Sequence, residues 1–179
     1  MKIVKESYYP LKDGKKLIAR EEFNGDKRDG VTERWYENGQ LCHHITYKNN
    51  KMNGLFEGWY PNGQLKVRET YKDDLLDGVS ERWDEDGKLI EFVNYKNDFK
   101  EGLSEWWYSN GQLGERSNWK KDKRDGLSEK WYKNGQMMYR VNYKDGNLDG
   151  TYEGWDSNGR LIEFVNYKNG HKVPSCKGK

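Results

Sequence analysis

The chain has little of what usually stabilises a secreted domain or a large apolar core. Its 179 residues include two cysteines and three prolines, and only 33% of them are hydrophobic. Two cysteines are too few for a disulfide scaffold, and no apolar run reaches the length of a signal peptide or a membrane span. We therefore expect a cytoplasmic protein without a membrane span, or a secreted or surface protein if an export signal precedes this sequence.

An excess of charge of either sign is also absent. The 32 lysines and arginines and the 30 aspartates and glutamates leave a net charge of +2, and both signs are spread along the chain. A nucleic-acid-binding protein needs a clustered basic excess, so we exclude nucleic acid as a partner. Low hydrophobicity often indicates disorder. Here, however, aromatic residues make up 15% of the chain, and they bury much area with few side chains.

A repeat of 24 residues dominates the sequence. It is marked by Trp35, Trp59, Trp83, Trp107, Trp131 and Trp155, by Gly30, Gly54, Gly78, Gly102, Gly126 and Gly150, and by Tyr47, Tyr71, Tyr95, Trp119, Tyr143 and Tyr167. A fixed period near this length indicates one supersecondary unit that is copied and stacked. We divide the chain into a divergent N-terminal capping hairpin (1–29), six tandem copies (30–173) and a tail (174–179), in which Pro174 would stop further strand pairing.

Each copy predicts a β-hairpin. Two short runs rich in aromatic and β-branched residues flank an Asn-Gly or Asp-Gly turn, such as Asn38-Gly39, which is the strongest short-range hairpin signal. The polar residues 48–53 and their equivalents would then link one hairpin to the next, and no segment has a helical period. The sequence predicts an all-β fold, an elongated single-layer antiparallel β-meander of about seven hairpin repeats.

The length of the turn decides which side chains share a face. A two-residue turn at Asn38-Gly39 places Trp35 opposite Cys42, whereas a three-residue turn with a left-handed Gly39 places it opposite Leu41. We favour the three-residue turn because it gathers large apolar side chains on one side of the sheet. The face that it predicts carries Val31, Glu33, Trp35, Leu41, Ile45 and Tyr47.

An acidic residue also recurs on this predicted face, at Glu33, Glu57, Glu81, Glu105, Glu129 and Glu153. In the favoured register the opposing pairs are Glu81 with Glu91, Glu105 with Glu115, and Glu153 with Glu163. Like charges directly opposite each other are destabilising, so we hypothesise that the repeat tryptophans and these paired glutamates bind a basic segment of a partner protein. Two alternatives stay open: lysines or arginines of adjoining copies neutralise the glutamates, or the two-residue turn pairs Glu57 with Arg68.

Candidate catalytic or metal-binding clusters are few. Cys42-His43-His44 is the best of them, but along a strand His43 would point away from both neighbours. Cys42 and His44 together supply too few ligands for a metal ion, and His171 stands alone. We predict no catalytic residues, no metal site and no cofactor, and therefore no enzyme.

The unit Trp-Tyr-x-Asn-Gly-Gln-Leu, followed by Tyr-Lys and a later Asp-Gly-Leu, resembles the variant MORN repeat of bacterial proteins. Clear copies occupy residues 35–41, 59–65 and 107–113, whereas copies three and six have Asp84 and Asp156 in place of tyrosine, which we interpret as repacking. The resemblance implies a noncatalytic protein-binding scaffold, such as an antitoxin or immunity protein that binds a toxin. The alternative is a cell-wall or carbohydrate-binding, or host-interacting, surface protein. An exposed aromatic stripe would also permit self-association.

Overall fold

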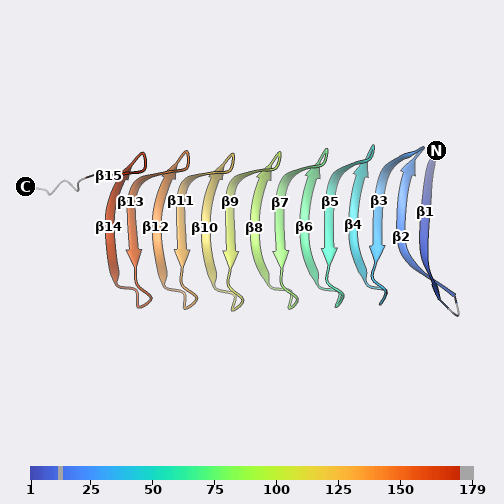
Figure 1. The fold of residues 1–179 in the computed structure, drawn as a ribbon, viewed down its shortest axis with the longest axis horizontal. Helices are drawn as coiled ribbons and strands as arrows, with labels where there is room; N and C mark the ends of the chain where they lie inside the picture. The colour runs from blue at the N-terminus through green and yellow to red at the C-terminus, as the bar shows by residue number, and fades with distance from the viewer. Residues whose placement is uncertain (12–13, 174–179) are drawn as a thin grey trace, which may run out of the picture. The chain divides into compact units, whose positions relative to one another are not determined.

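The computed structural model describes residues 1–11 and 14–173, and every helix or strand among them is a β-strand (Figure 1). The chain divides into two compact units, Met1–Leu89 and Ile90–Lys179. The strands of the first unit are β1 (Lys2–Leu11), β2 (Gly14–Asn24), β3 (Lys27–Trp35), β4 (Leu41–Lys48), β5 (Lys51–Trp59), β6 (Leu65–Lys72) and β7 (Leu75–Trp83). Those that follow are β8 (Leu89–Lys96), β9 (Phe99–Trp107), β10 (Leu113–Lys120), β11 (Lys123–Trp131), β12 (Met137–Lys144), β13 (Asn147–Trp155), β14 (Leu161–Lys168) and β15 (His171–Val173). Pro174 and the predicted tail lie outside the described residues.

Within each unit the strands form an open antiparallel meander. Sequence neighbours are sheet neighbours, so the order of the strands follows the chain. The residues that the structure describes contribute neither a helix nor a second sheet. The predicted all-β, single-layer fold class is therefore confirmed.

The Asn-Gly end of each hairpin is the predicted three-residue turn. In the first copy the Tyr36 N–H donates to Gln40 O at 2.9 Å, Gly39 has a φ of 90°, and Trp35 pairs with Leu41. The same hydrogen bond recurs in the other five copies. Glycine adopts the left-handed conformation at the third turn residue without a steric penalty, which is why the sequence signal here is reliable.

A second irregularity follows this turn and corrects the predicted face. The register shifts by one residue because Cys42 is an extra residue in β4, opposite no residue of β3. Beyond it, Ile45 pairs with Thr32, as a two-residue turn would have given. Side chains alternate between the two faces of a strand, so Ile45 and Tyr47 lie on the face opposite Trp35. The prediction that they share its face was wrong.

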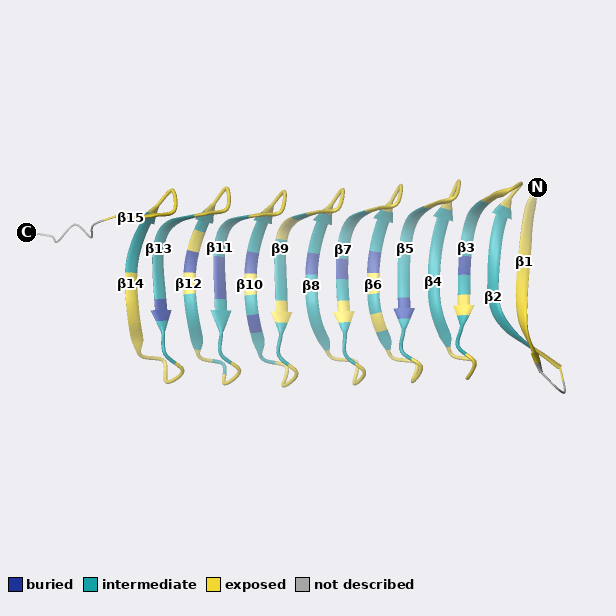
Figure 2. Ribbon diagram, viewed as in Figure 1, coloured by how far each residue is buried: buried dark blue, intermediate teal, exposed yellow. Residues whose placement is uncertain are grey.

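We call the two surfaces the tryptophan face, which carries the repeat tryptophans and the recurring glutamates, and the tyrosine face, which carries the Tyr47 column. A row of mostly small side chains runs along the middle of the tyrosine face. Its buried members are Thr32, Glu69 and Ser80 in the first unit and Val93, Ser117, Ser128 and Val141 in the second (Figure 2). Longer side chains stand on both sides of this row and cover it, which lets a single layer exclude water from its centre.

The predicted polar linkers are tight turns. Lys48 pairs with Lys51 across Asn49-Asn50, whose φ angles are 51° and 68°. Positive φ at both central residues defines a type I′ turn, which asparagine and aspartate tolerate better than other side chains. The Arg28 N–H also donates to Asn50 Oδ1 at 2.7 Å, so this turn is bonded to β3 as well as closing its own hairpin.

Side chains at the other end of the strands connect each copy to the next. Tyr36 Oη donates to Trp59 O and Asn38 Nδ2 donates to Pro61 O, both at 2.7 Å. Equivalent bonds are made by Tyr60, Asn62, Tyr108, Asn110, Tyr132 and Asn134. Asp84 and Asp156, which replace tyrosine, instead accept hydrogen bonds from backbone N–H groups of their own turns. These carboxylates cap the turn locally, which accounts for the departure of copies three and six.

Candidate functional site

The predicted partner-binding residues are divided between the two faces. The repeat tryptophans end the odd-numbered strands from β3 to β13, and each is half-buried on the tryptophan face. The predicted glutamates beside them are Glu81, Glu105 and Glu153, whereas those on the tyrosine face are Glu91, Glu115 and Glu163. Glu105 therefore does not face Glu115. Glu153 does not face Glu163 either, and both predictions were wrong because the register shift turns one member of each pair to the other side of the sheet.

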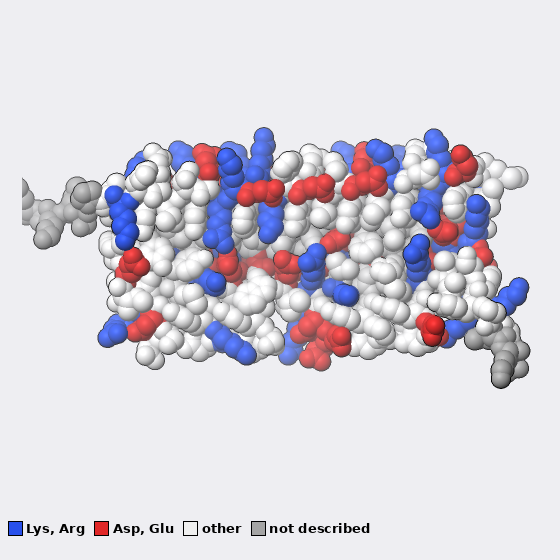
Figure 3. Space-filling view, in the orientation of Figure 1, with Lys and Arg blue, Asp and Glu red and all other residues white. Residues whose placement is uncertain are grey.

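Arginines face the glutamates of the tryptophan face. Arg68 in β6 pairs with Glu57 and with Glu81, and its Nε lies 2.9 Å from Glu57 Oε1. The Arg68 guanidinium also lies 5.7 Å from the centroid of the Trp83 ring. Equivalent ion pairs are Arg116–Glu105 at 2.6 Å and Arg140–Glu129 at 2.9 Å. The tryptophan face is therefore not a bare acidic stripe. Figure 3 shows one face of the molecule, on which basic and acidic side chains are intermixed.

A cleft of about 290 Å³ opens on the tyrosine face of the second unit. Ser104 lies in the middle row of this face, between the row of Trp106 and the row of Trp119, and all three line the cleft. In the second and sixth copies the position of Ser104 is held by Phe56 and Tyr152. Ser104 leaves space that an aromatic ring would fill in those two copies, and copies three and five also have a serine there, Ser80 and Ser128.

Two carboxylates flank the exposed indole at one side of the cleft. Trp106 is 41% exposed, and its cross-strand partners are Glu91 in β8 and Glu115 in β10. The Trp106 ring also stands edge-on to Tyr108, with centroids 4.6 Å apart. Cross-strand neighbours have Cβ atoms about 4.5–5.5 Å apart, so both carboxylates are within reach of a group that stacks on Trp106.

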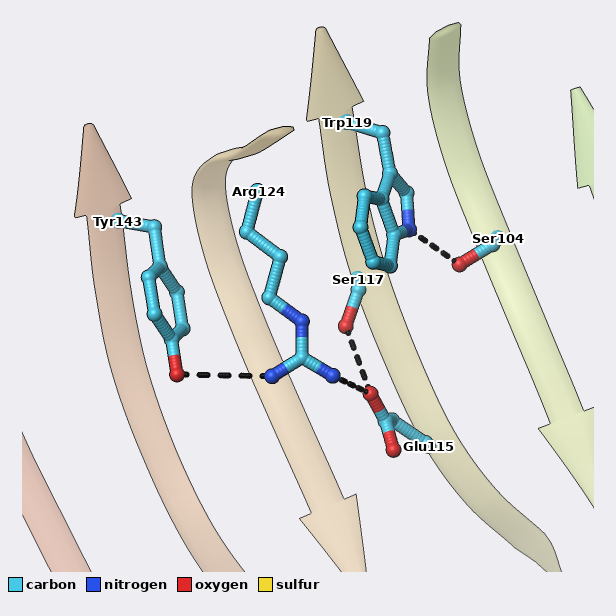
Figure 4. A network of polar contacts seen from close by, with 6 residues as sticks. All are labelled: Ser104, Glu115, Ser117, Trp119, Arg124 and Tyr143. Carbon is cyan, nitrogen blue, oxygen red and sulfur yellow. Dashed lines mark hydrogen bonds and ion pairs between the residues drawn. The ribbon is translucent and has the colours of Figure 1, made fainter. Parts of the chain in front are cut away.

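Two cations flank the indole at the other side of the cleft. Lys100 Nζ lies 4.9 Å and Arg124 Cζ 5.4 Å from the centroid of the Trp119 ring. Trp119 Nε1 donates to Ser104 Oγ at 2.6 Å, which fixes the orientation of the ring (Figure 4). Both contacts are in the range of cation–π attraction, so Trp119 is held by its surroundings whereas Trp106 is open to a partner.

A polar network connects the two sides of the cleft. Arg124 forms an ion pair with Glu115, and Ser117 Oγ donates to the same carboxylate oxygen at 3.1 Å (Figure 4). Arg124 Nη1 also donates to Tyr143 Oη at 3.5 Å. Burial, and then the negative charge of Glu115, raise the pKa of Tyr139. This network holds the Glu115 carboxylate in place beneath Trp106.

Comparison with known protein families bears directly on this geometry. A family model described as a MORN repeat variant matches residues 28–49, 52–73, 76–97, 100–121, 124–145 and 148–169, which together cover most of the chain. The chain belongs to the MORN repeat variant family. MORN repeats generally form protein- or membrane-binding scaffolds without catalytic activity. No curated protein matches the chain. None of the described residues belongs to a helix that could cross a membrane.

The cationic residues of the cleft were not predicted, although the MORN repeat itself contains the signal. The first positions of the six matched segments are Arg28, Met52, Leu76, Lys100, Arg124 and Leu148. The structure places this column beside the Tyr47 column, on the tyrosine face. Lys100 and Arg124 are consecutive charged members of a column that is apolar in three copies. A comparison of equivalent positions in the six copies would therefore have identified Lys100 and Arg124 as candidate site residues.

The Cys42-His43-His44 segment of the first MORN copy departs from the predicted geometry. Cys42 Sγ lies 3.0 Å from His43 Nδ1, because the extra residue at Cys42 breaks the alternation that would have separated them. His43 stacks on Phe56 with ring centroids 5.8 Å apart, whereas His44 pairs with Glu57 on the other face. Burial, followed by the charges of nearby basic residues, lowers the pKa of His43. Among the described residues, no three histidine, cysteine, aspartate or glutamate side chains are grouped to hold a metal ion.

Proposed function

We propose that this chain is a noncatalytic scaffold of the antitoxin or immunity type, and that its partner protein binds at the cleft of the second unit. The observation that supports this most strongly is the position of Trp106, which is exposed, borders a cleft and lies between Glu91 and Glu115. Aromatic residues that meet a partner at a pocket provide a large share of the energy of many protein interfaces. Glu91 and Glu115 make this side of the cleft acidic, although Arg124 already pairs with Glu115. A basic side chain of the partner would stack on the indole between them.

The tryptophan face is the second contact surface in this proposal. An interface of standard size covers about 800 Å² per partner, which is more than the cleft alone provides. The repeat tryptophans are half-buried, and Glu57, Glu105 and Glu129 beside them form ion pairs with arginines. A partner on this face would therefore meet alternating charges, and the binding of a basic segment there would have to displace arginine side chains.

Site-specific photo-crosslinking tests where the partner binds. A photoreactive phenylalanine analogue at position 106 should capture a partner in the source cell, whereas the same analogue at Arg34 should capture less of it. Arg34 is the matched control because it occupies the column of Trp106 three copies earlier and does not line the cleft. Equal capture at both positions would argue against the cleft.

The affinity of the captured partner then separates the two faces. Trp106→Ala should weaken binding by about 2 kcal/mol or more, roughly thirty-fold, as expected for a central aromatic contact. Replacing three glutamates of the tryptophan face with glutamine should change the affinity by less than about three-fold, because Glu81 and Glu105 are partly exposed and already form ion pairs with arginines. That triple variant is Glu81→Gln, Glu105→Gln and Glu153→Gln. If the triple variant loses binding and Trp106→Ala does not, the tryptophan face is the contact.

The same cleft supports a second candidate, a cell-wall or carbohydrate-binding module. Two indoles border the cleft, and five charged residues line it, three acids and two bases. A sugar ring can pack its C–H face on an indole while its hydroxyl groups both donate and accept hydrogen bonds. Titration of soluble cell-wall saccharides, followed by the indole NMR signals, tests this candidate. Saturable shifts that Trp106→Ala abolishes would support it, and unchanged signals would exclude it.

A further inference from the structure

One octapeptide occurs twice in this chain in two different environments. Leu-Ile-Glu-Phe-Val-Asn-Tyr-Lys forms both β8 and β14. In β8 the following strand covers the edge, through the pairs Glu91 with Trp106, Phe92 with Glu105, and Val93 with Ser104. In β14 the following strand is β15, which pairs only with residues 166–168. Among the strands that the structure describes, none pairs with the outer edge of residues 161–165.

The exposure of the two copies differs accordingly. Leu161 is 49% exposed, Ile162 62% and Phe164 56%, whereas all eight residues of β8 except its last are half-buried or buried. Figure 2 shows the same contrast along the two strands. Because the two octapeptides are identical, the difference in exposure comes from the strands on either side of them, and the strand that follows covers β8 but not residues 161–165 of β14. The edge of β14 is therefore a surface whose preferred cover, an antiparallel strand, is already seen on β8.

A second open edge lies on β1. Among the described strands it pairs only with β2, and Ile3 and Val4 are 41% and 50% exposed. Exposed apolar strand edges are templates for pairing with another chain. We propose that β1 of a second copy adds to β14, so that this chain self-associates through these two edges by antiparallel strand addition.

The side chains select one register for this pairing. Placing Lys5 of the second copy opposite Glu163 also sets Val4 opposite Phe164 and Ile3 opposite Val165. The junction covers residues 161–165 only, because β15 already pairs with residues 166–168. Met1 and Lys2 of the second copy must therefore leave the strand at this point. Lys5 and Glu163 are then on the same face, since Lys5 pairs with Glu21 in the Thr32 row and Glu163 pairs with Gly154 in the Trp106 row, both on the tyrosine face. This register pairs a lysine with a glutamate and apolar side chains with apolar side chains. Both are stabilising cross-strand combinations.

A symmetric pairing of two β14 strands fits less well. Antiparallel pairing centred on Glu163 would place two identical carboxylates opposite each other, which is destabilising. The nearest cation, Lys172 Nζ, lies 3.6 Å from Glu163 Oε1, and the Glu163 side chain remains 45% exposed. The β1 edge supplies a further cation instead. The junction joins two different edges, β1 of one copy and β14 of another. A dimer therefore still has one open β1 edge and one open β14 edge, and association can continue beyond it.

Sedimentation velocity of the full chain over a wide concentration range tests the proposal. Wild type should associate reversibly, and Lys5→Glu or Glu163→Lys alone should weaken association about five- to thirty-fold. An equimolar mixture of the two variants should restore it, because each junction again joins opposite charges. Glu91→Lys makes the same change in the covered octapeptide and should leave association unchanged.

Three outcomes would overturn the assignment. Wild type that stays monomeric at every concentration removes self-association itself. The pairing of Lys5 with Glu163 is excluded if the single charge reversals do not weaken association. It is also excluded if the mixture of the two variants does not associate as wild type does. Stronger association of Glu163→Gln would indicate the symmetric β14 pairing, since it removes the repulsion between like charges.

Disulfide trapping tests the register independently of affinity. In a background with Cys42→Ser and Cys176→Ser, a mixture of Val4→Cys and Phe164→Cys chains should form a disulfide between copies. Val4→Cys with Ile162→Cys should crosslink far more slowly, because that pair is diagonal and about 7–8 Å apart, beyond ordinary disulfide geometry. Equal trapping of both pairs would overturn the register.

Discussion

Replacing glycines with alanine can separate backbone strain from crowding in this sheet. Gly102 has a φ of 83°, but an added Cβ would have only an ordinary contact at 4.0 Å. Gly58 has no positive φ, and its added Cβ would lie 2.9 Å from Val67 Cγ1. Gly78 combines both features, with a φ of 141° and an added Cβ 2.9 Å from Thr70 Cβ. The three variants therefore report strain alone, crowding alone, and the two together.

The expected magnitudes follow from these distances. Holding a non-glycine residue in a sparsely populated backbone region costs about 1–3 kcal/mol, and the reduced entropy of the unfolded chain returns about 0.4–1 kcal/mol. Gly102→Ala should therefore lower the free energy of unfolding by about 1–2 kcal/mol. Gly58→Ala forces a side chain from its position, which typically costs about 1–3 kcal/mol. Gly78→Ala should lose more than Gly102→Ala, because Thr70 must also move.

Urea unfolding of each variant, followed by tryptophan fluorescence and far-UV circular dichroism, measures these losses. A change in midpoint with an unchanged slope reports stability alone, and the two signals should coincide for each variant. The strain argument is refuted if Gly102→Ala unfolds at the wild-type midpoint. The crowding argument fails if Gly78→Ala loses no more stability than Gly102→Ala.

Three further predictions concern the core, an ion pair and pH. Val141→Ala should lower the free energy of unfolding by about 1.5–2.5 kcal/mol in urea titrations, because Val141 is 1% exposed and the variant leaves a cavity. Arg140→Ala should cost about 1–2 kcal/mol, since it leaves the buried Glu129 carboxylate without the cation at 2.9 Å, and adding Glu129→Gln should recover part of the loss in thermal unfolding. Hydrogen bonding from the Arg160 N–H lowers the pKa of Asp156, so this carboxylate stabilises the fold at neutral pH and ceases to do so as the pH falls through its lowered pKa. The difference in melting temperature between wild type and Asp156→Asn should therefore shrink below about pH 4.

The fold was predictable because its signals are local and repeated six times. The Asn-Gly turn and the 24-residue period are both properties of short segments, and glycine at the third turn position has a direct conformational cause. The tight turn at Asn49-Asn50 was predicted only as a linker. Asparagine pairs are a weaker signal for a type I′ turn than Asn-Gly, and Lys121 holds a φ of 48° at the equivalent position of a later copy. Residue type alone therefore does not define these turns.

The pairing register of the hairpins was not predictable, because the three-residue turn and the strand pairing of the two-residue turn do not exclude each other. Gathering Trp35 and Leu41 favours the three-residue turn, whereas pairing glutamates with arginines favours the two-residue register. The structure satisfies both by inserting one extra residue, Cys42 in the first copy, between the turn and the body of the hairpin. Bulges of this kind re-aim the side chains that follow them. Since a one-residue slip moves every subsequent side chain to the other face, one unforeseen bulge was enough to misplace Ile45 and Tyr47.

The same bulge explains how one short repeat can keep a constant face and a variable one. The tryptophan face carries a tryptophan and a glutamate in every copy, while side chains of the turns connect successive copies, as Tyr36 Oη does by donating to Trp59 O. On the tyrosine face the residues differ from copy to copy, as in the column Arg28, Met52, Leu76, Lys100, Arg124 and Leu148. Random drift would leave unmatched charges beside a buried row, where an unpaired charge is costly. In the second unit, instead, three carboxylates and two cations line one cleft, with Glu115 and Arg124 in direct contact. That compensation, in positions where other copies place apolar side chains, is the strongest argument that the cleft is functional.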